Sequence, residues 1–186
     1  MFAKDDPSGL GRQKLHFEVR RANPADLDAL SSLVFERQGG ERAKYRARFE
    51  ARLREPEERP VLLVAELAAS GEVAAYGSLE WMVFAEDAPA DCVPSGWYLT
   101  GVIVGRAWQR AGIGAALTRA RIEAWKALGS KAGPLRFVVN QTNAPSVRLH
   151  AALGFVEERG SGEFQMPGVS FTGGTGLLFR LDATGS

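Results

Sequence analysis

The segment WYLTGVIVGRAWQRAGIGAALTRARIEAW, residues 97–125, limits what this chain can fold into more than any other. It begins with an apolar run typical of a strand, passes through a turn with an arginine and two glycines, and continues with the apolar period of a helix. The first N–H groups of a helix lack backbone partners and carry a partial positive charge. Gly112 and Gly114 allow close approach and positive φ, and Gln109 and Arg110 add side-chain donors. The segment therefore predicts a phosphate-type anion site at the start of the helix.

This turn has three other interpretations, and each depends on specific residues. In the simplest one, the glycines only shape a turn and Arg110 is solvated. A dinucleotide fold would need a third glycine where the chain has Leu117, and an acid after the next strand, where it has Asn140. The Gly-Lys-Ser/Thr of a P-loop does not occur in the chain. A nucleotide-binding protein with a Rossmann-like core is therefore the weaker hypothesis.

The apolar pattern of the whole chain predicts one α/β domain over 15–182, preceded by a flexible tail at 1–14. Neither a repeat nor a linker divides the domain. We expect a strand, two helices, three strands, a helix, a strand, a helix and two strands, with hairpins first and a parallel crossover later. The strands are expected at 15–22, 61–69, 72–84, 97–104, 134–140, 155–159 and 175–182, and the helices at 23–40, 41–60, 113–128 and 143–153.

Charge balance and cysteine content argue against several classes of function. A net charge of +1 gives no overall field toward nucleic acid or a membrane. The arginines of 41–60 are interspersed with acids, which is typical of a solvated helix face. Cys92 is the only cysteine, and His16 and His150 lie far apart in the sequence, so no metal site is expected. With no signal peptide and no apolar run of membrane length, we expect a cytoplasmic protein.

Two motifs resemble those of the GNAT family of N-acetyltransferases. QRAGIG at 109–114 matches the family's Q/R-x-x-G-x-G/A signature between a strand and a helix. NQTNAPSVRLHAALGF at 140–155 resembles its N-x-x-N…L-G-F segment. The resemblance implies an α/β fold with a mixed central sheet, helices on both faces and a splayed pair of parallel strands, here 97–104 and 134–140. It also implies acetyl-CoA as the co-substrate, lying between these two strands.

By the same resemblance, the N–H groups of 110–115 would hold the pyrophosphate, and the pantetheine arm would lie along Ile103 and Val104 like an added strand. The two asparagines of the second motif would contact the pantetheine side, with a serine one helical turn further on. Ile103 and Val104 are also expected in the core, and Asn143 is equally suited to cap a helix. The full set expected to bind the co-substrate is Ile103, Val104, Gln109, Arg110, Ala111, Gly112, Ile113, Gly114, Ala115, Asn140, Asn143 and Ser146.

Acetyl transfer needs a donor to the thioester carbonyl, a neutral amine and a proton for the leaving thiolate. The resemblance assigns the first role to the N–H of Val104. His150 stands where the family often has a tyrosine, and we expect it either to donate a proton or to pack near the co-substrate. Some members carry a glutamate where this chain has Tyr98, so Glu80 on the neighbouring strand is the candidate base, acting directly or through water. In the alternative interpretation Glu80 is a solvent-facing strand carboxylate. Separately, an amine that arrives neutral would need no dedicated base.

The resemblance implies an enzyme that transfers the acetyl group of acetyl-CoA to a primary amine of a small molecule, by direct attack in a ternary complex. The acceptor pocket is expected from the variable segments 24–55, 85–96 and 160–174, with the acids of 85–96 attracting a cationic amine. The acceptor could also be a protein N-terminus or a lysine side chain. Homodimers are common in the family, so the resemblance also implies a possible homodimer. The alternative function is an acyl-CoA-binding sensor or partner module that has lost catalysis.

Overall fold

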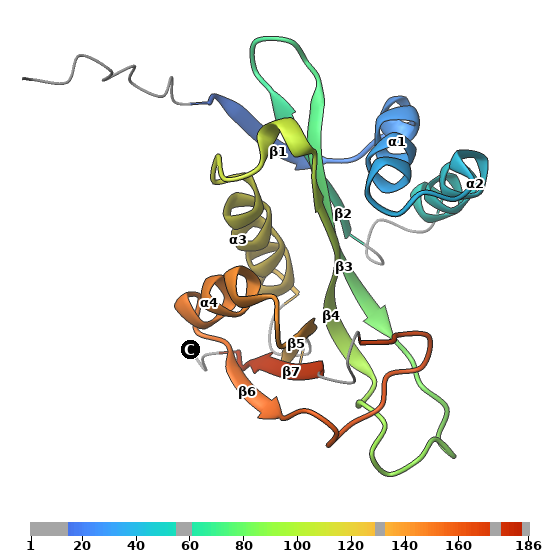
Figure 1. Cartoon of the computed structure of the whole chain (residues 1–186), viewed down its shortest axis with the longest axis vertical. Coiled ribbons are helices and arrows are strands. Elements are labelled where there is room, and N and C mark those ends of the chain that lie inside the picture. Colours follow the sequence, from blue (N-terminus) through green and yellow to red (C-terminus); the bar gives the residue numbers. More distant parts are fainter. Residues whose placement is uncertain (1–14, 55–60, 129–132, 172–175, 184–186) are drawn as a thin grey trace, which may run out of the picture.

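The computed structural model describes residues 15–54, 61–128, 133–171 and 176–183, in which a seven-stranded sheet carries helices on both faces (Figure 1). The expected α/β fold and element order are confirmed, while the tail at 1–14 and the end of the predicted helix 41–60 lie outside the described residues. The strands are β1 (Phe17–Arg21), β2 (Val61–Leu67), β3 (Val73–Met82), β4 (Gly96–Val104), β5 (Leu135–Asn140), β6 (Val156–Arg159) and β7 (Gly176–Leu181). The helices are α1 (Leu27–Gln38), α2 (Arg42–Leu53), α3 (Ile113–Lys126) and α4 (Ala144–Ala152), with short 3₁₀ turns η1 (Pro24–Asp26) and η2 (Arg106–Trp108).

The sheet has the order β1-β2-β3-β4-β5-β7-β6, and β4–β5 is the parallel pair that the sequence predicts. These two strands are in register only at Trp97 with Leu135 and at Tyr98 with Arg136. Beyond that point β4 continues beside β3, and β5 continues beside β7. The two strands therefore separate toward their carboxyl ends, which is the predicted splay.

Different helices cover the two faces of the sheet (Figure 1). On one face α3 buries Leu117 and Trp125 in the larger core cluster. On the other face α1 and α2 bury Leu30 and Phe49 against β2 and β3. Burial of each such side chain stabilises the fold by about 1.5–3 kcal/mol. The helices on both faces therefore stabilise the sheet in which β4 and β5 separate.

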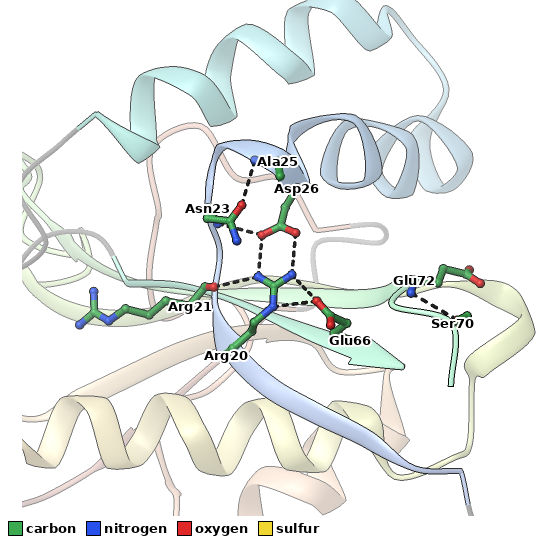
Figure 2. A network of polar contacts seen from close by, with 8 residues as sticks. All are labelled: Arg20, Arg21, Asn23, Ala25, Asp26, Glu66, Ser70 and Glu72. Carbon is green, nitrogen blue, oxygen red and sulfur yellow. Dashed lines mark hydrogen bonds and ion pairs between the residues drawn. The ribbon is translucent and has the colours of Figure 1, made fainter. Parts of the chain in front are cut away.

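A polar network fixes the start of α1 beside β1 and β2 (Figure 2). Arg20 donates two 2.8 Å hydrogen bonds to the carboxylate of Asp26 and also pairs with Glu66 on β2. Asp26 and Asn23 form a capping box, in which the N–H of Asn23 donates to Asp26 at 2.8 Å. Burial raises the pKa of the Asp26 carboxyl, but the bonds from Arg20 and Asn23 outweigh it, and the net pKa is lowered. The network therefore holds a charged carboxylate in a nearly closed site.

The described part of the chain has neither a membrane-length helix nor a cluster of metal-binding side chains. No helix in the described ranges combines the length and hydropathy needed to cross a bilayer. The same residues bring together no group of three or more His, Cys, Asp or Glu side chains that could hold a metal ion.

Candidate active site

A cleft of about 590 Å³ opens where β4 and β5 separate. Its walls come from the carboxyl halves of both strands, the first turns of α3, and α4. The cleft brings together eight of the predicted site residues, namely Ile103, Val104, Gln109, Gly114, Asn140, Asn143, Ser146 and His150. Its lining does not include Glu80, Arg110, Ala111, Gly112, Ile113 or Ala115.

Among the described residues, no strand pairs with the cleft-facing edge of β4 beyond Tyr98. The N–H of Gly105 donates to the carbonyl of Ala74 on β3 at 2.9 Å. Backbone groups of successive strand residues point to opposite edges, so the N–H of Val104 points away from β3 and into the gap. This amide is therefore oriented to donate to a group lying in the cleft.

The turn before α3 exposes backbone N–H groups, as predicted, although only one of its glycines is needed for the backbone. Gly112 has φ 84° and caps α3 without a side-chain hydrogen bond. The N–H groups of 113–115 make no hydrogen bond within the described residues, because the first intrahelical bond runs from Ala116 to Gly112. Gly114 is not in the left-handed region, and an added Cβ there would meet Val104 at 3.8 Å, an ordinary contact. Arg110, by contrast, has φ 62°, which the sequence did not suggest.

The two asparagines of the second motif line the cleft and also shape the backbone around it. Asn143 caps α4, and its side-chain oxygen accepts from the N–H of Ser146 at 3.3 Å. Asn140 accepts from the N–H and hydroxyl of Thr142, at 2.9 and 2.7 Å. The helix-cap interpretation of Asn143 is thus confirmed, and contact with a co-substrate stays a prediction for both.

His150 is buried and lines the cleft. Its ring stacks on Phe137, with the centroids 3.7 Å apart, and its Nδ1 lies 2.9 Å from the carbonyl of Ser146. A carbonyl only accepts, so Nδ1 carries the proton and Nε2 presents a lone pair. Burial lowers the pKa of His150 to about 4, with a smaller lowering by Arg121, although the bond to Ser146 raises it. The ring is therefore neutral at pH 7, which favours the packing interpretation over proton donation.

Glu80 lies outside the cleft, in a second cavity of about 440 Å³ between α1, α2, β3, β4 and residues 166–169. Its Oε1 pairs with Arg52 of α2 and accepts from the hydroxyl of Thr100 at 2.5 Å. The solvent-facing interpretation is therefore wrong, because the Glu80 side chain is only 18% exposed. It is instead held in place by an ion pair that the sequence did not predict.

The two cavities share the wall at which β4 and β5 part. Thr100, Gly101, Val138 and Val169 line both of them. A molecule in the second cavity would therefore adjoin one that occupies the splay. Two of the three segments expected to form an acceptor pocket, 24–55 and 160–174, contribute to this cavity. The third segment, 85–96, contributes no residue to the lining of either cavity. Its acids, Glu86, Asp87 and Asp91, therefore lie outside both.

Arg37, Arg121 and Phe137 are among the cleft-lining residues that the sequence did not single out. Arg121 is fully buried and donates to the main-chain carbonyls of Ser78 at 3.1 Å and Thr100 at 3.3 Å. A signal was available for it, because an arginine four residues from both Leu117 and Trp125 interrupts the apolar stripe of α3. Arg37 projects from α1, and nothing in its sequence context distinguishes it from a solvated cation.

Comparison with known proteins agrees with this geometry. A family model described as the Acetyltransferase (GNAT) family matches residues 26–155. No curated protein is similar enough to count as a match. Three solved structures illustrate the similarity of fold. The ribosomal-protein-alanine N-acetyltransferase from Brucella melitensis has a TM-score of 0.66 at 24% identity, with 89% of this chain and 99% of that one covered.

The other two were determined with acetyl-CoA. The putative acetyltransferase yncA from Salmonella typhimurium, with its cofactor acetyl-CoA, has a TM-score of 0.67 at 21% identity, with 92% of this chain and 96% of that one covered. A phosphinothricin acetyltransferase from Sinorhizobium meliloti in complex with AcCoA has a TM-score of 0.66 at 18% identity, with 89% and 88% covered. At these identities the likeness establishes the fold alone.

Proposed function

Because this chain belongs to the acetyltransferase (GNAT) family, we propose that it transfers the acetyl group of acetyl-CoA to a primary amine of a small molecule. The observation that carries this proposal is the meeting of two cavities at Thr100, Gly101, Val138 and Val169. One cavity lies in the splay and the other lies between α2 and β3. Both substrates would then be bound at once, and the amine would attack the thioester directly in a ternary complex.

The residues around the splay suit a phosphorylated, amide-containing co-substrate. The unpaired N–H groups of 113–115 at the positive end of α3 would hold the pyrophosphate, with Gln109 and Arg110 as flanking donors. The free edge of β4 around Ile103 and Val104 would pair with the pantetheine amides. At Gly112 an added Cβ would meet nothing within 4 Å, so the space beside this turn is open for a ligand.

The proposed reaction forms a carbon–nitrogen bond and breaks the thioester carbon–sulfur bond, so that CoA leaves as a thiolate and takes its proton from solvent. The N–H of Val104 would donate to the carbonyl oxygen as it gains negative charge. Glu80 would receive the amine proton, directly or through water, since both of its hydrogen bonds within the described residues fall on Oε1. His150 would support the cleft wall by packing, because its ring is neutral at pH 7.

The alternative, an acyl-CoA-binding sensor without catalysis, draws support from the same neutral histidine. A buried ring with a pKa of about 4 leaves the departing thiolate without a proton donor at this position. The two functions differ in one measurement, because only the enzyme releases a thiol from acetyl-CoA when an amine is added.

Thermal unfolding with acetyl-CoA, CoA, NADH and ATP in parallel tests the proposal. A ligand that binds only the folded state at a hundred times its Kd stabilises it by about 2.7 kcal/mol. We expect stabilisation by the two CoA species and not by NADH or ATP. Stabilisation by NADH or ATP, with none by acetyl-CoA or CoA, would contradict the proposal.

The variants Gly112→Asp and Gly112→Asn locate the binding site. Both residues tolerate positive φ, so both should fold, and only aspartate places a negative charge at the pyrophosphate position. We expect Gly112→Asp to weaken CoA binding about tenfold or more relative to Gly112→Asn. Equal CoA affinity in the two variants would place the pyrophosphate elsewhere.

A cytoplasmic location and a homodimer, both expected from the sequence, complete the proposal. Sedimentation of the purified protein over a range of concentrations tests the homodimer.

A further inference from the structure

The basic residues of α2 fall into two groups. Those on its outer surface have acidic partners on α1 and α2 or just before α2, as expected of a solvated helix face. These ion pairs join Arg42 and Arg46 to Asp28, Lys44 to Glu41, and Arg46 and Arg54 to Glu50. The other two arginines, Arg48, which is exposed, and Arg52, which is half-buried, line the second cavity.

The two arginines in the cavity are not balanced by equal negative charge. Arg52 pairs with Glu80, and Arg48 makes no hydrogen bond or ion pair within the described part of the chain. Glu80 is the only acid among the lining residues, so the described lining has one excess positive charge. Two like charges four residues apart on a helix also repel each other. Arg48 is exposed and solvated, and an anion bound between α2 and β3 would be attracted by both guanidinium groups.

Tyr76 adds a neutral donor to the same place. It is 5% exposed, lines the cavity, and its hydroxyl makes no hydrogen bond within the described residues. Burial raises the pKa of Tyr76 to about 12, while the nearby charges of Arg52 and Arg48 lower it, so the phenol keeps its proton at neutral pH. Its hydroxyl lies close to Gly101, where an added Cβ would meet it at 3.8 Å. The unpartnered phenol thus lies beside the wall that the two cavities share.

We propose that the acceptor of this enzyme is an amine that also carries a carboxylate, and that Arg48 and Tyr76 bind this carboxylate while Glu80 receives the amine. The inference rests on the proposed function and adds the chemical class of the acceptor to it. Glu80 contacts Thr100 in the shared wall, which puts the amine end of such a molecule toward the splay. A polyamine without an acid group would instead bring further positive charge against two arginines, which is unfavourable.

Thiol release from acetyl-CoA with pairs of acceptors tests the inference. Each pair consists of an α-amino acid and its carboxamide, which keeps the amine and the side chain and removes the negative charge. We expect the acids to be acetylated with a kcat/KM at least about tenfold above that of the carboxamides, after correction for the fraction of neutral amine. A panel in which only carboxamides or other uncharged amines react, or in which no acid reacts, overturns the inference.

Arg48→Gln and Arg46→Gln form a matched pair of variants on the same helix. Arg48→Gln should raise the KM for the acids about tenfold and leave the carboxamides unchanged, and Arg46→Gln should change neither. Equal KM values in the two variants would exclude Arg48 as the carboxylate ligand. Tyr76→Phe should raise the KM for the acids in the same selective way, and its ring keeps the edge contact with Phe49.

Thermal unfolding with acetyl-CoA alone separates the two levels of the argument. If acetyl-CoA does not stabilise the protein, the proposed function fails. If acetyl-CoA stabilises the protein and amines are acetylated without preference for acids, the function stands and this inference is wrong.

Discussion

Arg121 on α3 lies so close to Gly77 on β3 that a Cβ atom at position 77 would come within 3.2 Å of its Nε atom. Gly77 faces two residues of β4, because the register shifts from Tyr76 opposite Ile103 to Ser78 opposite Thr100. Such a bulge bends the strand that contains the extra residue. Arg121 donates to carbonyls beside this bulge and lines the cleft, so a buried cation supports the bend from which the splay begins.

The contact between these two residues predicts an energetic coupling. Gly77→Ala should lower the free energy of unfolding by about 1–3 kcal/mol, because the guanidinium is fixed by its hydrogen bonds and cannot move aside. In an Arg121→Met background the same change should cost less, by about 1 kcal/mol. Urea unfolding of the four proteins measures the coupling.

Gly114→Ala serves as the control for this cycle. Its added Cβ would make only an ordinary contact with Val104, so no loss of stability is expected. An equal cost of Gly77→Ala with and without Arg121 would show that contact with the guanidinium is not the source of that cost.

The sequence predicted those features of the fold that depend on local pattern. Alternating apolar residues located the strands, and the glycine turn located the helix start with its free N–H groups. Arg121 beside Gly77 was not predicted, because the two residues are brought together only by the packing of α3 on β3. The ion pair between Arg52 and Glu80 was not predicted either. The spacing of arginines along α2 does not show which of them reaches Glu80, because that depends on how α2 packs on the sheet. The partners of a buried charge depend on tertiary packing, which is why the sequence did not identify Arg121 as a site residue.

His150 predicts a loss of stability in mild acid. Its pKa is lowered from 6.5 to about 4 in the folded protein, so between these pH values the unfolded chain binds the additional proton. The free energy of unfolding should therefore fall by about 3 kcal/mol as pH decreases from 6.5 to 4, and this contribution is fully present above pH 6.5.

Urea unfolding of the wild type and of His150→Phe across this pH range measures the effect. Phenylalanine keeps an aromatic ring against Phe137 and does not titrate. The difference between the two proteins should follow the stated pH dependence. Parallel pH profiles would mean that position 150 stays solvated and freely protonated.

Asp26 predicts a loss of stability in stronger acid. Its pKa is lowered below 3.8 in the folded state, so its contribution is present above pH 3.8 and is lost as pH falls through the lower folded value. Asp26→Asn should therefore destabilise the protein by about 1–3 kcal/mol at pH 7, with a shrinking difference from wild type below pH 3.8. The matched control is Asp28→Asn, whose exposed ion pair with Arg46 should contribute no more than about 1 kcal/mol. Equal effects of the two substitutions would show that the network in Figure 2 is no stronger than a surface ion pair.

Glu80→Gln separates the chemistry from binding of the co-substrate. Glutamine keeps the shape of the side chain and can still accept from Thr100, but it cannot take a proton from the amine. We expect kcat/KM for the amine to fall about 10²- to 10⁴-fold, and to recover as pH rises and more amine is neutral. Steady-state kinetics should show an unchanged KM for acetyl-CoA, because Glu80 does not line the cleft in the splay.

Glu86→Gln is the control for Glu80→Gln, because Glu86 lies in the loop after β3 and lines neither cavity. It should leave both kinetic constants unchanged. A purely structural role for Glu80 would lower the melting temperature and kcat/KM together, without recovery at higher pH. Full activity of Glu80→Gln at neutral pH would instead mean that the amine arrives neutral and that the ion pair with Arg52 serves only to shape the cavity.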